Sequence, residues 1–392
     1  MDKSKRVFLC KILSMNFADI KIGILGGGQL GRMLIQEAIN LNIPTKVMDP
    51  DPNAPCKELS TYFYVGDLQD DELIETFGKS LDVVTIEIES VSVTGLKKLE
   101  DLGVKVYPQS RVVGVVQDKG LQKQFYQDKA IPTAPFFLID NKSQLNMDDV
   151  SFPFVQKLRK GGYDGKGVQI IKSAADFETK GFEEPSVIEQ AVDIDKEISV
   201  IVARDPKGNV VTYDSVEMEF NPEANLVEFL FAPSSLTPEQ EEIAQSLARK
   251  VIEELDMVGI LAVELFLDKE GNIVVNEIAP RAHNSGHQTI ENSHTSQYMQ
   301  LLRVLLDLPL GSTTLTSPGV MLNLLGEPGF IGTTKYEGVN EALAMEGVNL
   351  HFYGKKQTKP FRKMGHATVV DKDLEAAKVK ARKVQEVLKV KC

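Results

Sequence analysis

Residues 21–31 read KIGILGGGQLG. The apolar start of this stretch predicts a strand, its glycines predict a tight turn, and residues 29–40 follow with the spacing of an amphipathic helix. Two further strands are expected at 45–49 and 82–88. Because strands that alternate with helices form βαβ units, the N-terminal part is predicted to be an α/β domain built on a parallel sheet.

The glycine turn matches the pattern G-x-G-x-x-G, which opens the first helix of dinucleotide-binding domains. Asp49 ends the second expected strand, about where an acidic residue would bind a ribose. A helix N-terminus also attracts other anions. Three interpretations stay open here: a dinucleotide site, a site for another anionic ligand, and a turn that needs glycine for steric reasons alone.

The composition is that of a globular chain with about two to three domains. Its 392 residues are 42% hydrophobic and 26% charged, and the formal charge is −12. No window approaches the ~20 apolar residues of a membrane span, and the acidic balance disfavours nucleic acid as a partner. Cys10, Cys56 and Cys392 are too few for a disulfide framework or a zinc site, so a cytoplasmic protein is expected.

Residues 1–18 precede the first expected strand and are predicted to form an extension, in which Met1 and Met15 are both candidate start sites. Further along, a helix is expected at 118–129 and an extended, proline-restricted segment at 131–135. The remaining expected elements are short strands at 154–158, 168–171, 186–190 and 197–202, a helix at 238–255 capped by Thr237, a hairpin of 260–268 with 272–278, and a last helix at 374–388.

Four cations and four glycines share the segment KLRKGGYDGKG, residues 157–167, between two expected strands. Such a loop is basic and mobile, so its lysines and backbone N–H groups suit closure over a triphosphate. It is not a Walker loop, since the G-K-[ST] ending before a helix is missing. A solvated flexible turn is the alternative interpretation.

Glu264 and Glu277 lie on the two strands of the expected hairpin. They face each other if the connection is residues 269–272, whereas a three-residue loop would place Asn276 opposite Glu264. Carboxylate and amide oxygens on one patch of sheet suit Mg²⁺. Since the neighbouring residues are apolar, unpaired carboxylates would be costly there, and a salt bridge is the alternative to a metal ion.

Two later segments are candidates for anion binding. APRAHNSGH, residues 279–287, carries an arginine and two of the five histidines, which suit an anionic substrate or proton transfer. KKQTKPFRK, residues 355–363, carries five cations, which suit a monophosphate. For both segments a solvated loop is the alternative. Residues 157–166 and 355–363 hold nine basic residues and one acidic residue, so the rest of the chain carries 35 basic and 55 acidic residues, a charge of −20.

Three motifs, in this order, resemble the signatures of the ATP-grasp superfamily and, within it, of the 5-(carboxyamino)imidazole ribonucleotide synthase family of purine biosynthesis. They are GGGQLGRM at 26–33, GGYDGKG at 161–167 and NEIAPRAHNSGH at 276–287. The resemblance implies a doubly wound, Rossmann-like pre-ATP-grasp domain at 19–115, a central ATP lid at 116–202 and a C-terminal ATP-grasp domain at 203–392 with a terminal subdomain at about 318–392. It also implies a homodimer.

The resemblance implies a role for individual positions. The residues implied to bind ATP are Lys119, Lys157, Gly162, Tyr163, Asp164, Gly165, Lys166, Gly167, Val168, Glu189, Gln190, Ala191, Val192, Glu197, Asn276 and Glu277. The residues implied to bind the imidazole nucleotide or bicarbonate are Gly28, Gln29, Leu30, Tyr163, Asp164, Arg281, His283, Asn284, Lys355, Arg362 and Lys363. Glu264 and Glu277 would hold Mg²⁺, and Asp164, Arg281 and His283 would be catalytic, with the proton acceptor undecided between Asp164 and His283.

Two single positions and one strand segment depart from the family pattern. Lys119 stands where many relatives carry arginine, which keeps the charge but loses the bidentate geometry. Phe220 stands where a histidine is often found, and the role of Glu87 and Glu89 stays open because the usual strand sequence differs.

The implied reaction is the ATP-dependent carboxylation of 5-aminoimidazole ribonucleotide with bicarbonate, through carboxyphosphate. Four alternatives remain at this point: another ATP-grasp carboxylase of the biotin type, a formate-using transformylase, an NAD-dependent dehydrogenase based on the glycine turn and Asp49, and a nucleotide sensor without activity.

Overall fold

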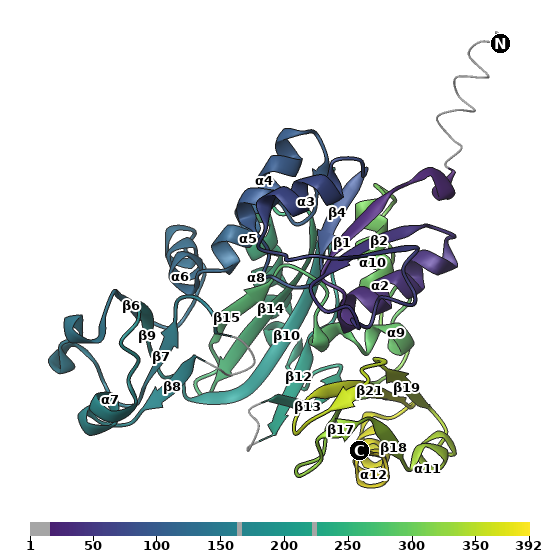
Figure 1. The fold of residues 1–392 in the computed structure, drawn as a ribbon. Coiled ribbons are helices and arrows are strands. Elements are labelled where there is room, and N and C mark those ends of the chain that lie inside the picture. Colours follow the sequence, from purple (N-terminus) through teal and green to yellow (C-terminus); the bar gives the residue numbers. More distant parts are fainter. Residues whose placement is uncertain (1–15, 163–166, 222–225) are drawn as a thin grey trace. The chain divides into compact units, whose positions relative to one another are not determined.

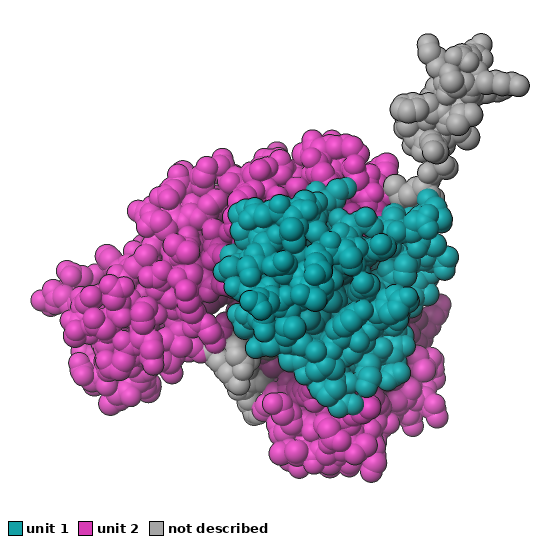
Figure 2. All heavy atoms as spheres, turned by 45° about the horizontal axis from the view of Figure 1, so that its top comes forward, with its two compact units in different colours: residues 1–107 teal, residues 108–392 magenta. Residues whose placement is uncertain are grey.

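The structure is a computed structural model that describes residues 16–162, 167–221 and 226–392 (Figure 1). Most of the expected N-terminal extension, residues 1–15, lies outside this part. The chain divides into two compact units, residues 1–107 and 108–392, which are coloured separately in Figure 2 and are described one at a time. None of the helices in the described ranges is both long and apolar enough to cross a membrane.

The first unit is built on a five-stranded parallel sheet of strand order β3-β2-β1-β4-β5. Within the described residues this is the doubly wound strand order 3-2-1-4-5 without a sixth strand, which confirms the expected α/β class. Its elements are η1 (Phe17–Asp19), β1 (Ile22–Leu25), α2 (Gln29–Asn40), β2 (Thr45–Asp49), β3 (Tyr62–Val65), α3 (Asp71–Gly78), β4 (Val83–Ile86), α4 (Val93–Asp101) and β5 (Lys105–Val106).

Strand β3 was not expected from the sequence. It is an edge strand, and Tyr62, Tyr64 and Val65 are exposed on it. Because most of its side chains stay exposed, its sequence lacks the alternation of apolar and polar residues that signals a half-buried strand.

The second unit begins with two helices and a small antiparallel sheet of order β6-β9-β7-β8. Three of its strands coincide with the expected ranges. The elements are α5 (Ser110–Val116), α6 (Lys119–Asp128), β6 (Phe136–Ile139), η2 (Lys142–Gln144), η3 (Met147–Asp149), β7 (Phe154–Leu158), β8 (Val168–Ile171), α7 (Ala174–Lys180) and β9 (Ser186–Gln190).

A nine-stranded sheet forms the rest of the unit, with the order β15-β14-β10-β12-β13-β16-β21-β19 and β11 beside β10. Helix α8 begins with the expected capping box at Thr237 and packs on β10 and β14 in a core that includes Val251, Leu261 and Val263. The elements up to the polar loop are β10 (Ile194–Arg204), β11 (Val210–Thr212), β12 (Val216–Asn221), β13 (Leu226–Ala232), α8 (Pro238–Glu254), β14 (Gly259–Asp268) and β15 (Ile273–Ala279).

The C-terminal lobe continues the same sheet and covers it with α12, whose buried alanines 377 and 381 let it approach β16 and β21. Its elements are η4 (Asn284–Gly286), α9 (Thr289–Asn292), α10 (Gln297–Leu305), β16 (Gly319–Leu325), β17 (Gly332–Thr333), β18 (Lys335–Glu337), α11 (Val339–Leu343), β19 (Val348–Phe352), β20 (Gln357–Thr358), β21 (Lys363–Val370), α12 (Leu374–Val387) and β22 (Lys389–Lys391). Strand β10 runs through the expected domain boundary at 202–203, and the expected boundaries stay predictions.

Candidate active site

Two glutamates face each other across the hairpin of β14 and β15. The turn between the strands has three residues, 269–271, which by itself would place Asn276 opposite Glu264. A β-bulge shifts the register by one residue, so that Glu264 pairs with Glu277 and Asn276 becomes the extra residue. The carboxylates therefore face each other as expected. The three-residue loop alone would have placed Asn276, and not Glu277, opposite Glu264.

The two carboxyl groups have opposite electrostatic environments. Burial, and then the charges of Glu277 and Glu197, raise the pKa of Glu264 to about 8. The ammonium group of Lys119 contacts the Glu277 carboxylate and lowers its pKa to about 2. A cation beside both carboxyl groups would lower the pKa of Glu264, so that Glu264 would be ionised as well. The pair thus offers the oxygen ligands that suit Mg²⁺.

A buried ion network lies next to this pair. Glu189, which is 4% exposed, pairs with Lys123 at 3.2 Å and with Lys157 at 2.9 Å. Lys157 Nζ also donates to Asn276 Oδ1 at 2.9 Å. Burial opposes the charge of Glu189, yet Lys157 and Lys123 lower its pKa below the usual value. Two ammonium groups share one carboxylate here, which favours binding of a further anion.

Lys123 is a site residue that sequence reasoning missed. Helix α6 begins after the cap residue Asp118, and Lys123 lies one helical turn after Lys119, so that the i, i+4 spacing was the available signal. Its Nζ donates to Thr133 Oγ1 at 2.5 Å, and Thr133 donates to Val275 O at 2.8 Å. Burial lowers the pKa of Lys123 to about 8. These bonds tie α6 to the strand that carries Glu277.

The basic loop is described at its two ends. Gly162, Gly167 and Val168 belong to the described residues, whereas Tyr163, Asp164, Gly165 and Lys166 lie outside them. Arg159 at the start of the loop makes two bonds to Asp118, at 2.9 and 2.8 Å. This arginine therefore anchors the loop to the start of α6.

Residues 189–192, which the family resemblance implies bind ATP, include the end of β9 and the start of the connection to β10. Gln190 N–H donates to Pro135 O at 2.9 Å, and the half-buried Ala191 and Val192 lead to β10. The Glu189 carboxylate is paired with lysines, and the ATP contacts expected for this segment stay predictions.

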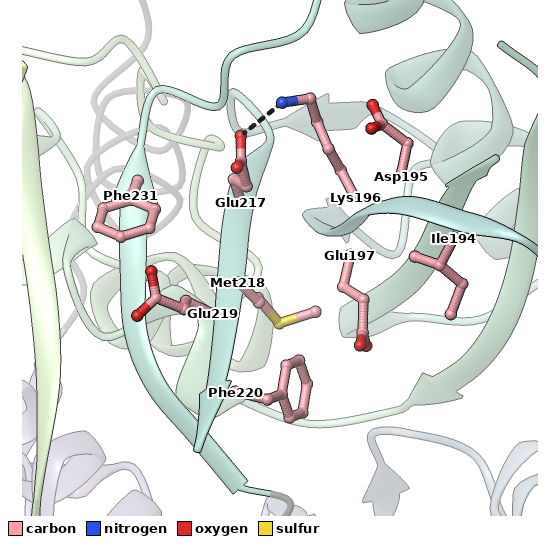
Figure 3. A pocket seen from close by; sticks show the side chains of 9 residues that line it. All are labelled: Ile194, Asp195, Lys196, Glu197, Glu217, Met218, Glu219, Phe220 and Phe231. Atoms are coloured by element: carbon pink, nitrogen blue, oxygen red, sulfur yellow. Dashed lines mark ion pairs between the residues drawn. The ribbon is translucent and has the colours of Figure 1, made fainter. Parts of the chain in front are cut away.

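A pocket lies beside β10 and β12 (Figure 3). It is lined by Ile194, Asp195, Lys196, Glu197, Glu217, Met218, Glu219, Phe220 and Phe231. Glu197, which the family resemblance implies binds ATP, is the register partner of Met218. Burial raises the pKa of Glu197 to about 7. Phe220 lines the same pocket, so the departure from the family pattern places an aromatic ring near this carboxyl group.

His283 is held beside the carboxylates by Gln297, a second residue that sequence reasoning missed. His283 N–H donates to Gln297 Oε1 at 2.9 Å, and Gln297 Nε2 donates to His283 O at 2.7 Å. His283 Nε2 lies 3.6 Å from Glu264 Oε1. Burial, followed by the charge of Arg281, lowers the pKa of His283 to about 3, so its ring is neutral at pH 7.

The other expected residues of this loop already make contacts. Arg281 Nη1 donates to Ala282 O at 3.0 Å. Asn284 and Asn323 of β16 exchange two amide hydrogen bonds of 2.9 Å each. Asn284 therefore fastens the loop to the sheet, and its expected substrate contact would need these bonds to change.

The cationic segment 355–363 folds back on itself. Lys355 Nζ donates to Lys363 O, and Arg362 Nη1 donates to Gln357 O, both at 2.7 Å. Lys363, at the start of β21, is close enough to His283 to help lower its pKa. The last cation of the segment is therefore close to His283.

In the first unit, carboxylates already occupy the glycine turn. Gly27 N–H donates to Asp49 Oδ2 at 2.6 Å, and Leu30 N–H donates to Glu87 Oε1 at 3.1 Å. A Cβ atom on Gly28 would collide with Glu87. Two carboxylates at the start of α2 oppose a pyrophosphate there, which argues against the dinucleotide interpretation. Gly28, Gln29 and Leu30 stay predicted substrate contacts.

Comparison with known proteins decides the family. Family models match residues 20–117 as a ribonucleotide synthetase preATP-grasp domain, 124–298 as an ATP-grasp domain and 319–380 as a phosphoribosylaminoimidazole carboxylase C-terminal domain. The N5-carboxyaminoimidazole ribonucleotide synthase of Bacillus subtilis is 35% identical, over 88% of this chain and 90% of the relative. The chain belongs to the N5-carboxyaminoimidazole ribonucleotide synthase family. This membership confirms the expected ATP-grasp fold and the expected class of ATP-dependent ligase.

Solved structures agree with this family. The N5-carboxyaminoimidazole ribonucleotide synthetase of Thermotoga maritima is 44% identical with a TM-score of 0.88, covering 95% of this chain and 99% of that one. The Aspergillus clavatus synthase in complex with ADP and 5-aminoimidazole ribonucleotide is 30% identical with a TM-score of 0.86, covering 95% and 99%. The chain spans 65% and 63% of two longer phosphoribosylaminoimidazole carboxylases, from Vigna aconitifolia and Candida glabrata, at 36% identity.

The substitution Glu189→Gln is expected to lower the free energy of unfolding by about 3 kcal/mol, because it leaves Lys123 and Lys157 buried without a carboxylate. The measurement is urea unfolding followed by circular dichroism. Asp193→Asn is the matched control, since it removes the partner of Lys269 in an ion pair whose side chains are 74% and 61% exposed, and it should change stability little. Equal losses of unfolding free energy in the two variants would show that the burial of Glu189 does not strengthen its contribution to stability.

Glu197 is expected to make stability depend on pH. Its folded-state pKa of about 7 lies above the ordinary value of 4.5, so between these values the folded state binds the extra proton and stability falls as pH rises. Glu197→Gln should remove about 3 kcal/mol of this fall between pH 4.5 and 8. Parallel stability curves for the two proteins would show that Glu197 titrates normally.

Proposed function

We propose that the chain carboxylates 5-aminoimidazole ribonucleotide with bicarbonate and ATP, giving N5-carboxyaminoimidazole ribonucleotide, ADP and phosphate. The observation that carries this proposal is the facing pair of Glu264 and Glu277 next to the buried lysines 123 and 157 and the half-buried Lys119. Such a site favours transfer of a phosphoryl group, since it offers ligands for a cation and positive charge for phosphate oxygens. The Aspergillus clavatus complex with ADP and 5-aminoimidazole ribonucleotide supports both substrates.

The first step activates bicarbonate, which is a poor electrophile. A bicarbonate oxygen attacks the γ-phosphorus, the bond to the β-phosphate oxygen breaks, and ADP leaves while carboxyphosphate forms. Lys157 and Lys119 offset the negative charge that develops on the transferred group. To do so, Lys157 would exchange its bond with Asn276 for a phosphate oxygen.

The second step forms the carbon–nitrogen bond. The exocyclic amine of the nucleotide attacks the carboxyl carbon, phosphate leaves, and the amine loses one proton. His283 lies beside Glu264 with its backbone fixed by Gln297, so it is positioned to orient the carboxyl group. The choice between His283 and Asp164 as proton acceptor is part of the proposal, and Asp164 lies outside the described residues.

Glu264 and Glu277 would hold Mg²⁺, which when bound supplies a Lewis acid for the phosphate oxygens. The donor set fits this ion, because two facing carboxylates and the nearby Asn276 amide offer oxygen ligands. Lys119 now neutralises Glu277 in part, and it stands where arginine is usual in the family.

The proposal extends to the nucleotide phosphate, the location and the assembly. Lys355, Arg362 and Lys363 would bind the phosphate of the imidazole nucleotide, with Arg281 nearer the reacting groups. We propose a cytoplasmic homodimer, as the family resemblance implies, whose assembly light scattering measures directly.

The deciding experiment measures phosphate release by the purified chain with ATP, bicarbonate and 5-aminoimidazole ribonucleotide. Release that requires all three substrates supports the proposal. Formate in place of bicarbonate, and biotin in place of the nucleotide, test the transformylase and biotin-carboxylase alternatives. Absence of turnover together with NADH binding would instead favour the dehydrogenase.

Glu277→Gln is expected to reduce phosphate release at least 100-fold, because the amide removes one anionic ligand and the charge partner of Lys119. Glu270→Gln on the exposed turn of the same hairpin is the control and should keep the wild-type rate. Circular dichroism checks that both variants fold. A Glu277→Gln enzyme with the wild-type Mg²⁺ requirement and rate would remove this residue from the metal site.

Arg362→Ala is expected to raise the KM for 5-aminoimidazole ribonucleotide about tenfold or more, since a charge-assisted bond to phosphate is lost, while the KM for ATP changes little. Lys359→Ala removes a charge from an exposed position of the same segment and serves as the control. If both variants raise both KM values alike, the segment acts through its overall charge and not through a dedicated phosphate site.

A further inference from the structure

A cluster of metal-ligand side chains lies apart from the glutamate pair. His351 of β19 and His366 of β21 are register partners on neighbouring antiparallel strands, and their rings stack at 4.5 Å with an interplanar angle of 10°. Glu291 of α9 reaches them, with its Oε1 atom 2.6 Å from His351 Nε2. One ligand atom from each of these three residues lies within 4.8 Å of the others.

Two atoms of this cluster have unused bonding capacity. Within the part of the chain that the structure describes, His366 Nε2 and Glu291 Oε2 are buried and have no hydrogen-bond partner. His366 is 0% exposed, so water does not solvate its ring freely. A buried polar atom without a partner costs about 1–3 kcal/mol. A ligand that bonded to both atoms would remove this cost and so stabilise the folded state.

More such atoms lie on the same two segments. Within the described ranges, buried polar atoms of the segment 287–292 and of β21 again have no hydrogen-bond partner. They are His287 Nε2, Gln288 Oε1, Asn292 Nδ2 and Thr368 Oγ1. Because α9 contacts β21, these unsatisfied atoms belong to one region of the second unit. A built polar site accounts for this concentration better than isolated defects do.

A neighbouring tyrosine sets up His366 as a ligand. Tyr353 OH lies 2.9 Å from His366 Nδ1. When Nδ1 carries the proton and donates to this oxygen, Nε2 keeps its lone pair, which is the arrangement of metal-binding histidines with an outer hydrogen-bond partner. Tyr353 is 1% exposed, so this contact is protected from water.

We infer that Glu291, His351 and His366 bind a divalent transition-metal ion of the zinc type. Two imidazoles and one carboxylate form a common zinc ligand set, and they leave a fourth position for water. The ligand set differs from the oxygen-rich Glu264 and Glu277 pair, which suits Mg²⁺. The ion would join α9, which follows the loop of His283, to two strands of the C-terminal lobe. This inference does not rest on the proposed function.

A simple ion pair does not explain the cluster. The contact between His351 and Glu291 satisfies one atom of each residue, but among the described residues it leaves His366 Nε2 and Glu291 Oε2 without hydrogen-bond partners. A buried water molecule is the competing occupant, because it is also able to bridge these atoms. The two occupants differ in one measurable respect: water leaves the imidazole signals insensitive to added zinc.

The test uses the full-length chain, stripped of metal with a chelator and labelled with ¹⁵N at histidine. The chain has five histidines, so their ring nitrogen signals can be assigned by substitution. Zn²⁺ is titrated in the presence of excess Mg²⁺, which occupies the glutamate pair. We expect one equivalent of Zn²⁺ to shift the ring nitrogens of His351 and His366 and to raise the thermal unfolding midpoint.

Substitutions separate this site from others. His351→Gln and Glu291→Gln should each weaken Zn²⁺ binding at least tenfold in equilibrium dialysis. His294→Gln is the matched control, since His294 is exposed and outside the cluster, and Glu277→Gln controls for the glutamate pair. Both controls should bind zinc as the wild type does.

Three outcomes would overturn the inference. The first is that zinc leaves the signals of His351 and His366 unchanged, as a buried water predicts. The second is that zinc moves the His283 signal and that Glu277→Gln abolishes binding, which would place the ion at the glutamate pair. The third is that His351→Gln folds normally and binds zinc with wild-type affinity.

Discussion

The carboxyl groups of Glu264 and Glu277 face each other inside an antiparallel sheet, and the arrangement of the second unit depends on this pair. Like charges at this spacing repel, and the surrounding residues are apolar, so the pair needs nearby cations. Lys119 supplies one cation directly, and Lys157 reaches the intervening Asn276 while it pairs with Glu189. The first turns of α6, strand β7 and strand β9 are thereby fixed around one hairpin, which is where we propose that ATP and a metal ion bind.

The β-bulge at Asn276 marks the limit of what the sequence alone could predict about this site. Both glutamates, and the alternation that puts them on one face, were readable from the residues. The register was not, because the turn length predicts one pairing and the bulge produces the other. Lys157, far away in sequence, holds the bulged Asn276 side chain, and such a contact leaves no local pattern. The same reason explains why Gln297 went unnoticed beside His283.

Strong periodicity predicted most of the fold. Strands β2, β7, β8 and β9 coincide with the expected ranges, and α8 begins at the expected cap. Failure occurred where burial was weak, as in β3, whose exposed Tyr62 and Tyr64 give no alternation. Contacts between segments that are distant in sequence were also missed: the two hydrogen bonds that Asn284 exchanges with Asn323 were not predicted, whereas its expected substrate contact stays a prediction. Segments with clear local periodicity are therefore the ones that sequence reasoning places well.

The glycine turn matches a dinucleotide-binding motif, but two carboxylates accept hydrogen bonds from its N–H groups. In a dinucleotide site the N–H groups at the helix start face a pyrophosphate. Here Asp49 and Glu87 accept hydrogen bonds from Gly27 and Leu30 instead, so an anion at this position would meet negative charge. A ligand that presents an amine or hydroxyl group would meet acceptors. The turn therefore presents hydrogen-bond acceptors and not a pyrophosphate site, and the substrate contacts expected for Gly28, Gln29 and Leu30 stay predictions.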